Sequence, residues 1–231
     1  MTSFNAVTKT AKVFSITGKY LLKSMISGSC VVDLKSRWAC EILNHFNIDL
    51  TIKDRPALLN QSSVMLGNHI SYLDIPILIA CCPDVVFVSK KEVKFWPVIG
   101  NAAVKMKTIF VERHNADSRA SAKATIARSL KEKNLNLIIF PSGTTKIGVS
   151  PRWQKGIFEI AEENNIVVYP FRIKYSPERD CAYIDDDNLL IHMSNLFRLK
   201  KIKVTVEFHP AVLVNTESIN HWKEWSEASD F

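Results

Sequence analysis

The residues of this sequence with the clearest capacity for chemistry are His69 and Asp74, within the segment GNHISYLDIP at residues 67–76. On one regular helix a separation of five residues turns two side chains about 140° apart. They can therefore meet only if His69 precedes a helix and Asp74 lies in its first turn. Asp74 would then hold one imidazole nitrogen and leave the other free as a general base. The alternative is a packing histidine beside an aspartate that stabilises a helix N-terminus.

A base at this position has no serine nucleophile of the usual kind to activate. The sequence has no GxSxG motif, and Ser142 follows a proline with no base fixed beside it. A base without an enzyme nucleophile indicates that the hydroxyl group of a substrate attacks directly. The pattern therefore favours group transfer over hydrolysis through an acyl-enzyme.

The elements around this pair alternate between strands and helices, which predicts an α/β fold with a mixed, largely parallel and buried sheet. We expect strands at 64–66, 85–88, 108–111, 137–140 and 166–169, the last stopped by Pro170. Helices are expected at 73–82, 116–133 and 154–163. Further along, we expect strands at 182–184 and 203–208, a helix around Leu196 and a polar helical tail from Glu217. The alternation within 203–208 suggests one solvated face and a place near a sheet edge.

Residues 1–50 read as a pair of amphipathic helices, and residues 51–231 as one catalytic domain. One side of the first helix carries apolar residues: Phe4, Val7, Ala11, Phe14, Leu21, Leu22 and Met25. Its other side carries lysines, although Val13, Ile16 and Tyr20 interrupt that polar face. This pattern fits a helix lying in a membrane interface and equally a helix packed on the core.

The composition is that of a globular protein, and the positive net charge favours anionic partners of several kinds, such as nucleic acid, lipid headgroups or a phosphorylated cofactor. The chain has 231 residues and a net charge of +7, with 47% hydrophobic residues. No window reaches the ~20 charge-free apolar residues that span a bilayer, and no secretory signal is apparent. The five cysteines lack metal-type spacing and are expected to be reduced and buried. We find no Walker A or dinucleotide fingerprint, no metal site and no basic-aromatic stripe for nucleic acid.

Four blocks in order resemble the glycerolipid acyltransferases, the family of the 1-acyl-sn-glycerol-3-phosphate acyltransferases. They are Asn68-His69-x4-Asp74, Phe110-Val111-Glu112-Arg113, Phe140-Pro141-Ser142-Gly143-Thr144 and Val168-Tyr169-Pro170. The resemblance implies that His69 is the general base, that Asp74 orients it and that Arg113 binds the acceptor. It also implies substrate contacts from Asn68, the third block and Pro170. The backbone N–H of Gly143 is a candidate oxyanion donor.

The same resemblance implies transfer of a fatty acyl group to a lysophospholipid, in the simplest case 1-acyl-sn-glycerol-3-phosphate. The donor would be acyl-CoA or acyl-carrier protein, used as a substrate with no further cofactor. The protein would act peripherally at the cytoplasmic face of an anionic membrane.

The third block departs from the family pattern at two positions. Ser142 stands where glycerophosphate enzymes usually have Glu, and Thr145 where they commonly have Arg. Loss of that arginine removes donors suited to a phosphate. A second acceptor, lyso-ornithine lipid, is therefore an alternative. The segments NHISYLDIP and VSKKEVKFWPVIG resemble that branch, as does Tyr183-Ile184-Asp185-Asp186 with His192. A third alternative is an inactive membrane-binding module.

Overall fold

The computed structural model describes residues 3–26, 30–58, 61–112, 115–184 and 186–228. Its described strands form one sheet of seven in the order β1-β7-β6-β2-β5-β3-β4. The strands are β1 (Ile48–Lys53), β2 (Ser63–Gly67), β3 (Val86–Lys90), β4 (Ile109–Val111), β5 (Asn136–Ile139), β6 (Val167–Ser176) and β7 (Ile202–Phe208). Neighbouring strands are parallel except for the antiparallel pair β6 and β7. The predicted α/β fold with a mixed, largely parallel sheet is confirmed.

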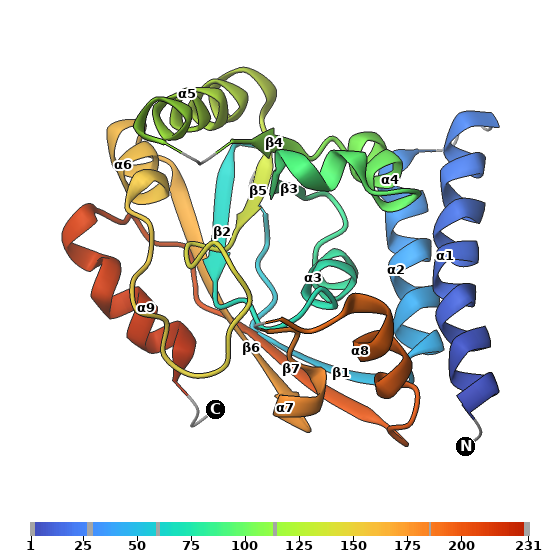
Figure 1. Cartoon of the computed structure of the whole chain (residues 1–231). Helices are drawn as coiled ribbons and strands as arrows, with labels where there is room; N and C mark the ends of the chain where they lie inside the picture. Colours follow the sequence, from blue (N-terminus) through green and yellow to red (C-terminus); the bar gives the residue numbers. More distant parts are fainter. Residues whose placement is uncertain (1–2, 27–29, 59–60, 113–114, 185, 229–231) are drawn as a thin grey trace.

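Helices cover both faces of this sheet (Figure 1). One group comprises α5 (Ala116–Lys133), α6 (Gly156–Glu163) and α9 (Ile219–Glu227), which follows the short η2 (Thr216–Ser218). The other comprises α1 (Ser3–Ile26), α2 (Val31–His45), α3 (Asp74–Cys81), η1 (Lys91–Phe95), α4 (Ile99–Lys105) and α8 (Leu189–Leu196). The short α7 (Glu178–Cys181) follows β6.

The central strand β2 shows how the sequence serves two cores. Val64 and Leu66 pack in the cluster under α5, α6 and α9, whereas Met65 packs in the cluster under α2 and α3. Successive strand residues point to opposite faces, so an uninterrupted apolar run is what a doubly covered strand requires. All three of these side chains are fully buried.

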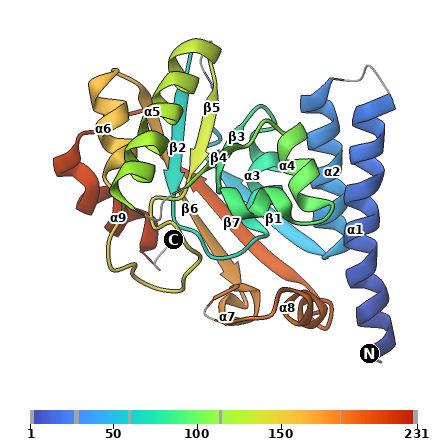
Figure 2. The ribbon, with the colours of Figure 1, turned by 45° about the horizontal axis from the view of Figure 1, so that its top comes forward.

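The N-terminal helices α1 and α2 lie side by side at one end of the molecule (Figure 2). Trp38 Nε1 donates to Thr17 Oγ1 at 3.2 Å, which joins the two helices. Ile16 is buried, and Val13 and Tyr20 pack against the core. The core-facing side of α1 thus carries the residues that interrupt the predicted polar face, together with Phe14 from the predicted apolar side.

The predicted apolar side of α1 is largely exposed. The exposed fractions of Val7, Leu22 and Met25 are 61%, 59% and 59%; the side chain of Phe4 lies outside the described residues. In contrast, α2 buries Ile42 in the core. Among the described residues, no helix is both long and apolar enough to cross a membrane.

Strand β6 corrects one prediction, because it continues through Pro170 to Ser176. Val168 exchanges backbone hydrogen bonds with Val212, and the pairing of β6 with β7 begins only at Phe171 and Phe208. The backbone N–H groups of alternate residues in a strand point to the same neighbouring strand. An N–H at position 170 would therefore point the same way as that of Val168, into the gap between the Val168–Val212 bridge and the β6–β7 pairing. A proline is tolerated where the ladder is interrupted.

Three further predictions need correction. No strand forms at 182–184, where Tyr183 N donates instead to Ile70 O at 3.0 Å. Strand β1 was not predicted, and the boundary drawn between residues 50 and 51 falls inside it. By contrast, the prediction that the strand at 203–208 lies near a sheet edge is confirmed, because β7 is next to the edge strand β1. Cys30 and Cys40 are exposed, whereas Cys81, Cys82 and Cys181 are buried as predicted.

Candidate active site

His69 and Asp74 meet in the predicted way at the carboxyl end of β2. His69 Nδ1 lies 2.7 Å from Asp74 Oδ2. His69 is in the loop after β2, and Asp74 is the first residue of α3. A carboxylate only accepts hydrogen bonds, so in the neutral imidazole Nδ1 carries the proton and Nε2 has the free lone pair. The pair can therefore act as a base held in one tautomer by its aspartate.

The start of α3 is shaped to hold this carboxylate. Asp74 is fully buried, and its Oδ2 also accepts the backbone N–H groups of Ile70 at 2.8 Å and Ser71 at 3.1 Å. Pro76 lies in the first turn of α3, where backbone N–H groups have no helical partner, so the helix loses no hydrogen bond there.

The loop that carries His69 is anchored to β6 by Asn68. Its side-chain amide donates to Ile173 O and accepts from Ile173 N, both at 2.8 Å. Gly67 packs so close to β6 that a Cβ atom on it would lie 2.2 Å from Phe171 O. Asn68 therefore positions the loop, and it is not among the described residues that line the cavity beside His69.

The third block forms the other wall of the site. The ring of Phe140 stacks on the imidazole of His69, with centroids 3.8 Å apart and planes 10° apart. The Lys146 backbone N–H donates to His69 O at 2.8 Å. The stacked ring restrains the imidazole plane, and the backbone hydrogen bond ties the loop of His69 to the third block.

Within the third block, the structure corrects the role proposed for the Gly143 backbone. Gly143 has a φ of 74°, which suits a residue without Cβ. Its N–H donates to Phe140 O at 3.0 Å and closes a turn, so it is not available to an oxyanion. Ser142 Oγ donates to Thr144 O at 2.8 Å, which occupies that hydroxyl within the same turn.

An apolar cavity of about 450 Å³ opens beside His69. Its walls come from the face of the sheet that bears α1–α4 and α8. The apolar lining includes Phe14, Trp38, Ile42, Phe46, Leu73, Ile75, Phe87, Ile99, Ala103, Met106, Leu189 and Met193. Among the described lining residues, His69 and Lys90 are the basic groups, and none is acidic. No local sequence pattern predicts that these separate helical faces converge on one cavity.

The residues predicted to contact substrate divide into three groups. Phe140, Gly143 and Thr144 line the cavity together with His69. Asn68, Pro141, Ser142 and Pro170 are described but do not line it. Arg113 and Asp185 lie outside the described residues.

A cluster of aromatic rings beside the cavity, formed by Tyr72, Tyr183 and the buried His192, was not predicted as part of the site. His192 Nε2 lies 2.9 Å from Ala182 O, so it donates there, and Nδ1 accepts from Tyr72 Oη at 3.1 Å. Burial lowers the pKa of His192 and raises the pKa of Tyr72, which keeps both groups neutral. Tyr72 and Tyr183 also line the cavity, with ring centroids 5.5 Å apart.

The position of the family arginine in the third block is occupied by Thr145, whose hydroxyl donates to Tyr183 O. This bond ties the third block to the segment that leads from α7 to α8. The threonine therefore serves the packing of the wall and adds no positive charge to it.

The buried thiols are poor nucleophiles in this environment. Burial raises the pKa of Cys82 to about 11 and that of Cys181 to about 12. The thiolate is the reactive form, so these groups are inert near neutral pH. In the part of the chain that the structure describes, no cluster of His, Cys, Asp or Glu could hold a metal ion.

Comparison with known proteins decides the family to which this site belongs. A family model described as Acyltransferase matches residues 47–174, which include β1, the His69–Asp74 pair and the third block. The chain belongs to the acyltransferase family. The resemblance that the four blocks suggested is therefore confirmed.

Curated relatives carry two names. The lyso-ornithine lipid O-acyltransferase of Pseudomonas aeruginosa is 32% identical over 195 residues, which cover 80% of this chain and 74% of that protein. The 1-acyl-sn-glycerol-3-phosphate acyltransferase of Cocos nucifera is 26% identical over 170 residues, which cover 71% of this chain. The matched region spans about half, 51%, of the coconut protein.

The fold is shared with a solved structure, the 1-acyl-sn-glycerophosphate acyltransferase PlsC from Thermotoga maritima. The TM-score is 0.73, and the match covers 97% of this chain and 93% of that chain. The sequences are 14% identical, so this likeness concerns the fold alone.

Proposed function

We propose that this acyltransferase moves a fatty acyl group from a thioester to the hydroxyl of a lysolipid. The observation that carries the proposal is the His69–Asp74 contact of 2.7 Å at the wall of an apolar cavity. His69 Nε2 takes the proton of the lysolipid hydroxyl while its oxygen attacks the thioester carbonyl. The tetrahedral intermediate then expels the thiolate, which takes the proton from the imidazolium. The products are the acylated lipid and a free thiol.

The shape of the cavity supports an acyl substrate. Its described lining is mostly apolar, and a fatty acyl chain gains about 0.8 kcal/mol for each CH₂ that leaves water. The exposed Lys90 at the lining suits the phosphate groups of an acyl-CoA or of an acyl-carrier prosthetic group.

Two acceptors follow from the relatives and the site. The lysophospholipid 1-acyl-sn-glycerol-3-phosphate is favoured by the relatives of that name and by the second block. Lyso-ornithine lipid is favoured by Thr145, whose hydroxyl is committed to Tyr183 O at the position of the family arginine. It is also favoured by the Pseudomonas aeruginosa relative. We regard the second acceptor as the one that the third block fits better.

The test offers purified protein one acyl-CoA with each lysolipid in turn and measures thiol release together with the acylated lipid. We expect thiol release that depends on lysolipid, with a higher kcat/KM for lyso-ornithine lipid. A higher kcat/KM for 1-acyl-sn-glycerol-3-phosphate would assign the first acceptor. Binding to vesicles with no thiol release on either acceptor would support the inactive membrane-binding module.

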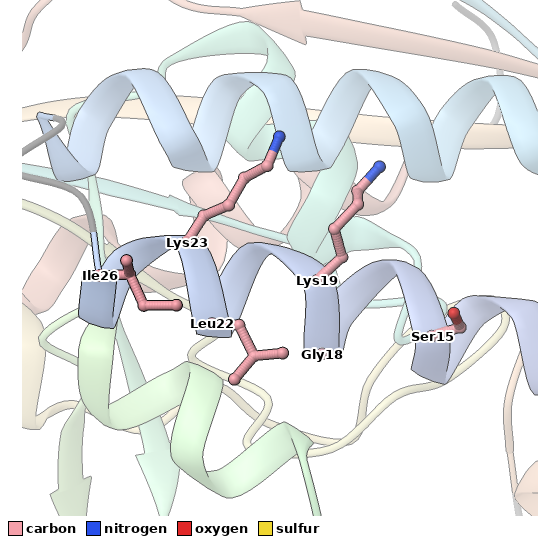
Figure 3. A pocket seen from close by; sticks show the side chains of 6 residues that line it. All are labelled: Ser15, Gly18, Lys19, Leu22, Lys23 and Ile26. Atoms are coloured by element: carbon pink, nitrogen blue, oxygen red, sulfur yellow. The ribbon is translucent and has the colours of Figure 1, made fainter.

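We further propose that the protein docks peripherally on an anionic membrane, at its cytoplasmic face, through α1. A shallow groove on this helix is lined by Ser15, Gly18, Lys19, Leu22, Lys23 and Ile26 (Figure 3). Leu22 points away from α2, whereas Lys19 and Lys23 point toward it, and Lys19 Nζ pairs there with Glu41. Ile26 is 84% exposed. Apolar groups in the acyl region with lysines at the phosphates are the pattern of an interfacial helix.

A further inference from the structure

We infer that Tyr175 is a positioning residue for the transfer reaction, acting on His69 through Asp74. This inference rests on the proposed function, because it concerns the base of that reaction. Tyr175 Oη donates to Asp74 Oδ1 at 2.5 Å. Asp74 Oδ2 is the oxygen that holds His69 Nδ1, so the tyrosine and the histidine bind opposite oxygens of one carboxylate.

Both oxygens of the Asp74 carboxylate accept hydrogen bonds, which restrains its rotation. Oδ2 accepts from His69 and from the backbone amides of Ile70 and Ser71, and Oδ1 accepts from Tyr175. Without Tyr175, Oδ1 would be a buried charged acceptor with no partner from the described residues. A buried unpaired charge of this kind is costly. A small rotation of the carboxylate would relieve part of that cost and would turn the imidazole, which stays bound to Oδ2, out of its working orientation.

Tyr175 itself is placed with little freedom. It lies in β6 opposite Val204 of β7, beyond the point where β2 ends, and its side chain is fully buried. Burial and the neighbouring Asp74 carboxylate raise its pKa well above the usual value, so the hydroxyl stays protonated and donates. The antiparallel pairing of β6 with β7 thus fixes a hydrogen-bond donor at Asp74 Oδ1, the carboxylate oxygen that does not bind His69.

A donor on Oδ1 also shares the negative charge that stabilises a protonated His69. Removal of that donor leaves more of the charge facing the imidazole. The protonated, inactive form of the base would then persist to higher pH. The expected signature is a kcat effect with an upward movement of the acid limb of the pH–rate profile.

The first variant is Tyr175→Phe, with Tyr169→Phe as its matched control. Both tyrosines are buried in β6, but Tyr169 Oη donates to Ala57 O at 3.3 Å, away from the catalytic pair. We expect Tyr175→Phe to lower kcat about tenfold with KM unchanged within about twofold. The acid limb of kcat should move to higher pH, and Tyr169→Phe should change neither quantity. An unchanged kcat and acid limb in a folded Tyr175→Phe variant would overturn the inference.

A second variant keeps the ring and the hydroxyl in case Tyr175→Phe does not fold. Site-specific incorporation of 3,5-difluorotyrosine at position 175 makes the hydroxyl a stronger donor. The acid limb of kcat should then move to lower pH, opposite to the effect of Tyr175→Phe. An unmoved acid limb in this variant would contradict the role of Tyr175.

An NMR measurement separates failure of this inference from failure of the proposed function. The Nδ1 proton of His69, assigned by its loss in His69→Ala, should give a low-field signal in the wild-type protein. It should shift and exchange faster with solvent in Tyr175→Phe but not in Tyr169→Phe. An unchanged signal would refute the inference even in a protein without turnover. Absence of wild-type turnover with a changed signal would refute only the proposed function.

Discussion

At the scale of single residues, the site separates the chemistry from the choice of acceptor. The base depends on contacts of His69 with Asp74 and Phe140. We propose that the choice of acceptor depends on the wall where the Thr145 hydroxyl donates to Tyr183 O. A substitution in this wall can therefore change the acceptor without touching the base.

We expect Thr145→Arg to raise kcat/KM for 1-acyl-sn-glycerol-3-phosphate, relative to lyso-ornithine lipid, by about tenfold. A guanidinium supplies paired donors that match a phosphate. Thr145→Val is the control, because it also loses the bond to Tyr183 O but adds no charge. Equal losses on both acceptors in Thr145→Arg and Thr145→Val would argue against this assignment. The measurement is initial-rate kinetics with each acceptor.

The neutral, buried His192 predicts a pH dependence of stability. Burial lowers its pKa in the folded chain, below the usual value of 6.5. As pH falls from 6.5 toward the folded value, the unfolded chain binds the proton that the folded chain excludes, so the free energy of unfolding decreases. On acidification, the thermal unfolding temperature should therefore fall less in His192→Gln than in the wild type. The exposed His221→Gln serves as the control, and a wild-type pH dependence in His192→Gln would be evidence against the buried neutral state.

At the scale of secondary-structure elements, close approach between β2 and β6 holds the catalytic loop. Gly67 leaves no space for a side chain, because a Cβ atom would lie 2.2 Å from the Phe171 carbonyl oxygen. Strands β2 and β6 are held together by parallel pairing, in which Gly67 lies opposite Phe171. The position of His69 therefore depends on a backbone contact two residues earlier.

Gly67→Ala is expected to lower the free energy of unfolding by about 1–3 kcal/mol and to reduce activity, because β2 or β6 must shift. Gly18→Ala is its matched control in α1, where a Cβ atom meets nothing within 4 Å. That helical substitution should instead stabilise the protein by about 0.5–1 kcal/mol. Urea unfolding of both variants checks the pair. Equal stability of the two would show that the contact at Gly67 is not tight.

The sequence predicted local elements well and long-range partners poorly. The apolar runs at 64–66 and 137–140 predicted buried strands, and they form β2, the central strand of the sheet, and its neighbour β5. The spacing of His69 and Asp74 predicted their contact, because five residues span one loop and one turn. The partners of Asp74 and Asn68 on β6 are 101 and 105 residues distant in the chain, and no local pattern encodes them. Apolar and polar residues alternate in β1, but that segment was not predicted as a strand because residues 1–50 were interpreted as helical.

At the scale of the whole molecule, α1 contributes both to the cavity beside His69 and to the exposed apolar surface of the protein. Phe14 of α1 and Trp38 of α2 line the cavity that reaches His69. Nearer the end of the same helix, Leu22 and Met25 are exposed to solvent. An interfacial α1 would therefore place the cavity next to the layer from which a lysolipid comes.

Leu22→Glu should lower the affinity for anionic vesicles by about tenfold, because an apolar anchor becomes a charge repelled by the surface. Leu213→Glu is the control, since Leu213 is also exposed, at 69%, in the segment after β7. Cosedimentation with vesicles of defined anionic lipid content measures the affinity. Activity on lysolipid dispersed in detergent should be unchanged in both variants. An equal loss of vesicle affinity in both variants would contradict docking through α1.

The most direct test of the account is the rate of acyl transfer by His69→Ala. Removal of the general base should lower kcat by about 10²–10⁴-fold, measured as lysolipid-dependent thiol release. The thermal unfolding of this variant should resemble that of His221→Ala, an exposed histidine variant that should keep full activity. Undiminished transfer by His69→Ala would contradict the assignment of His69 as the base.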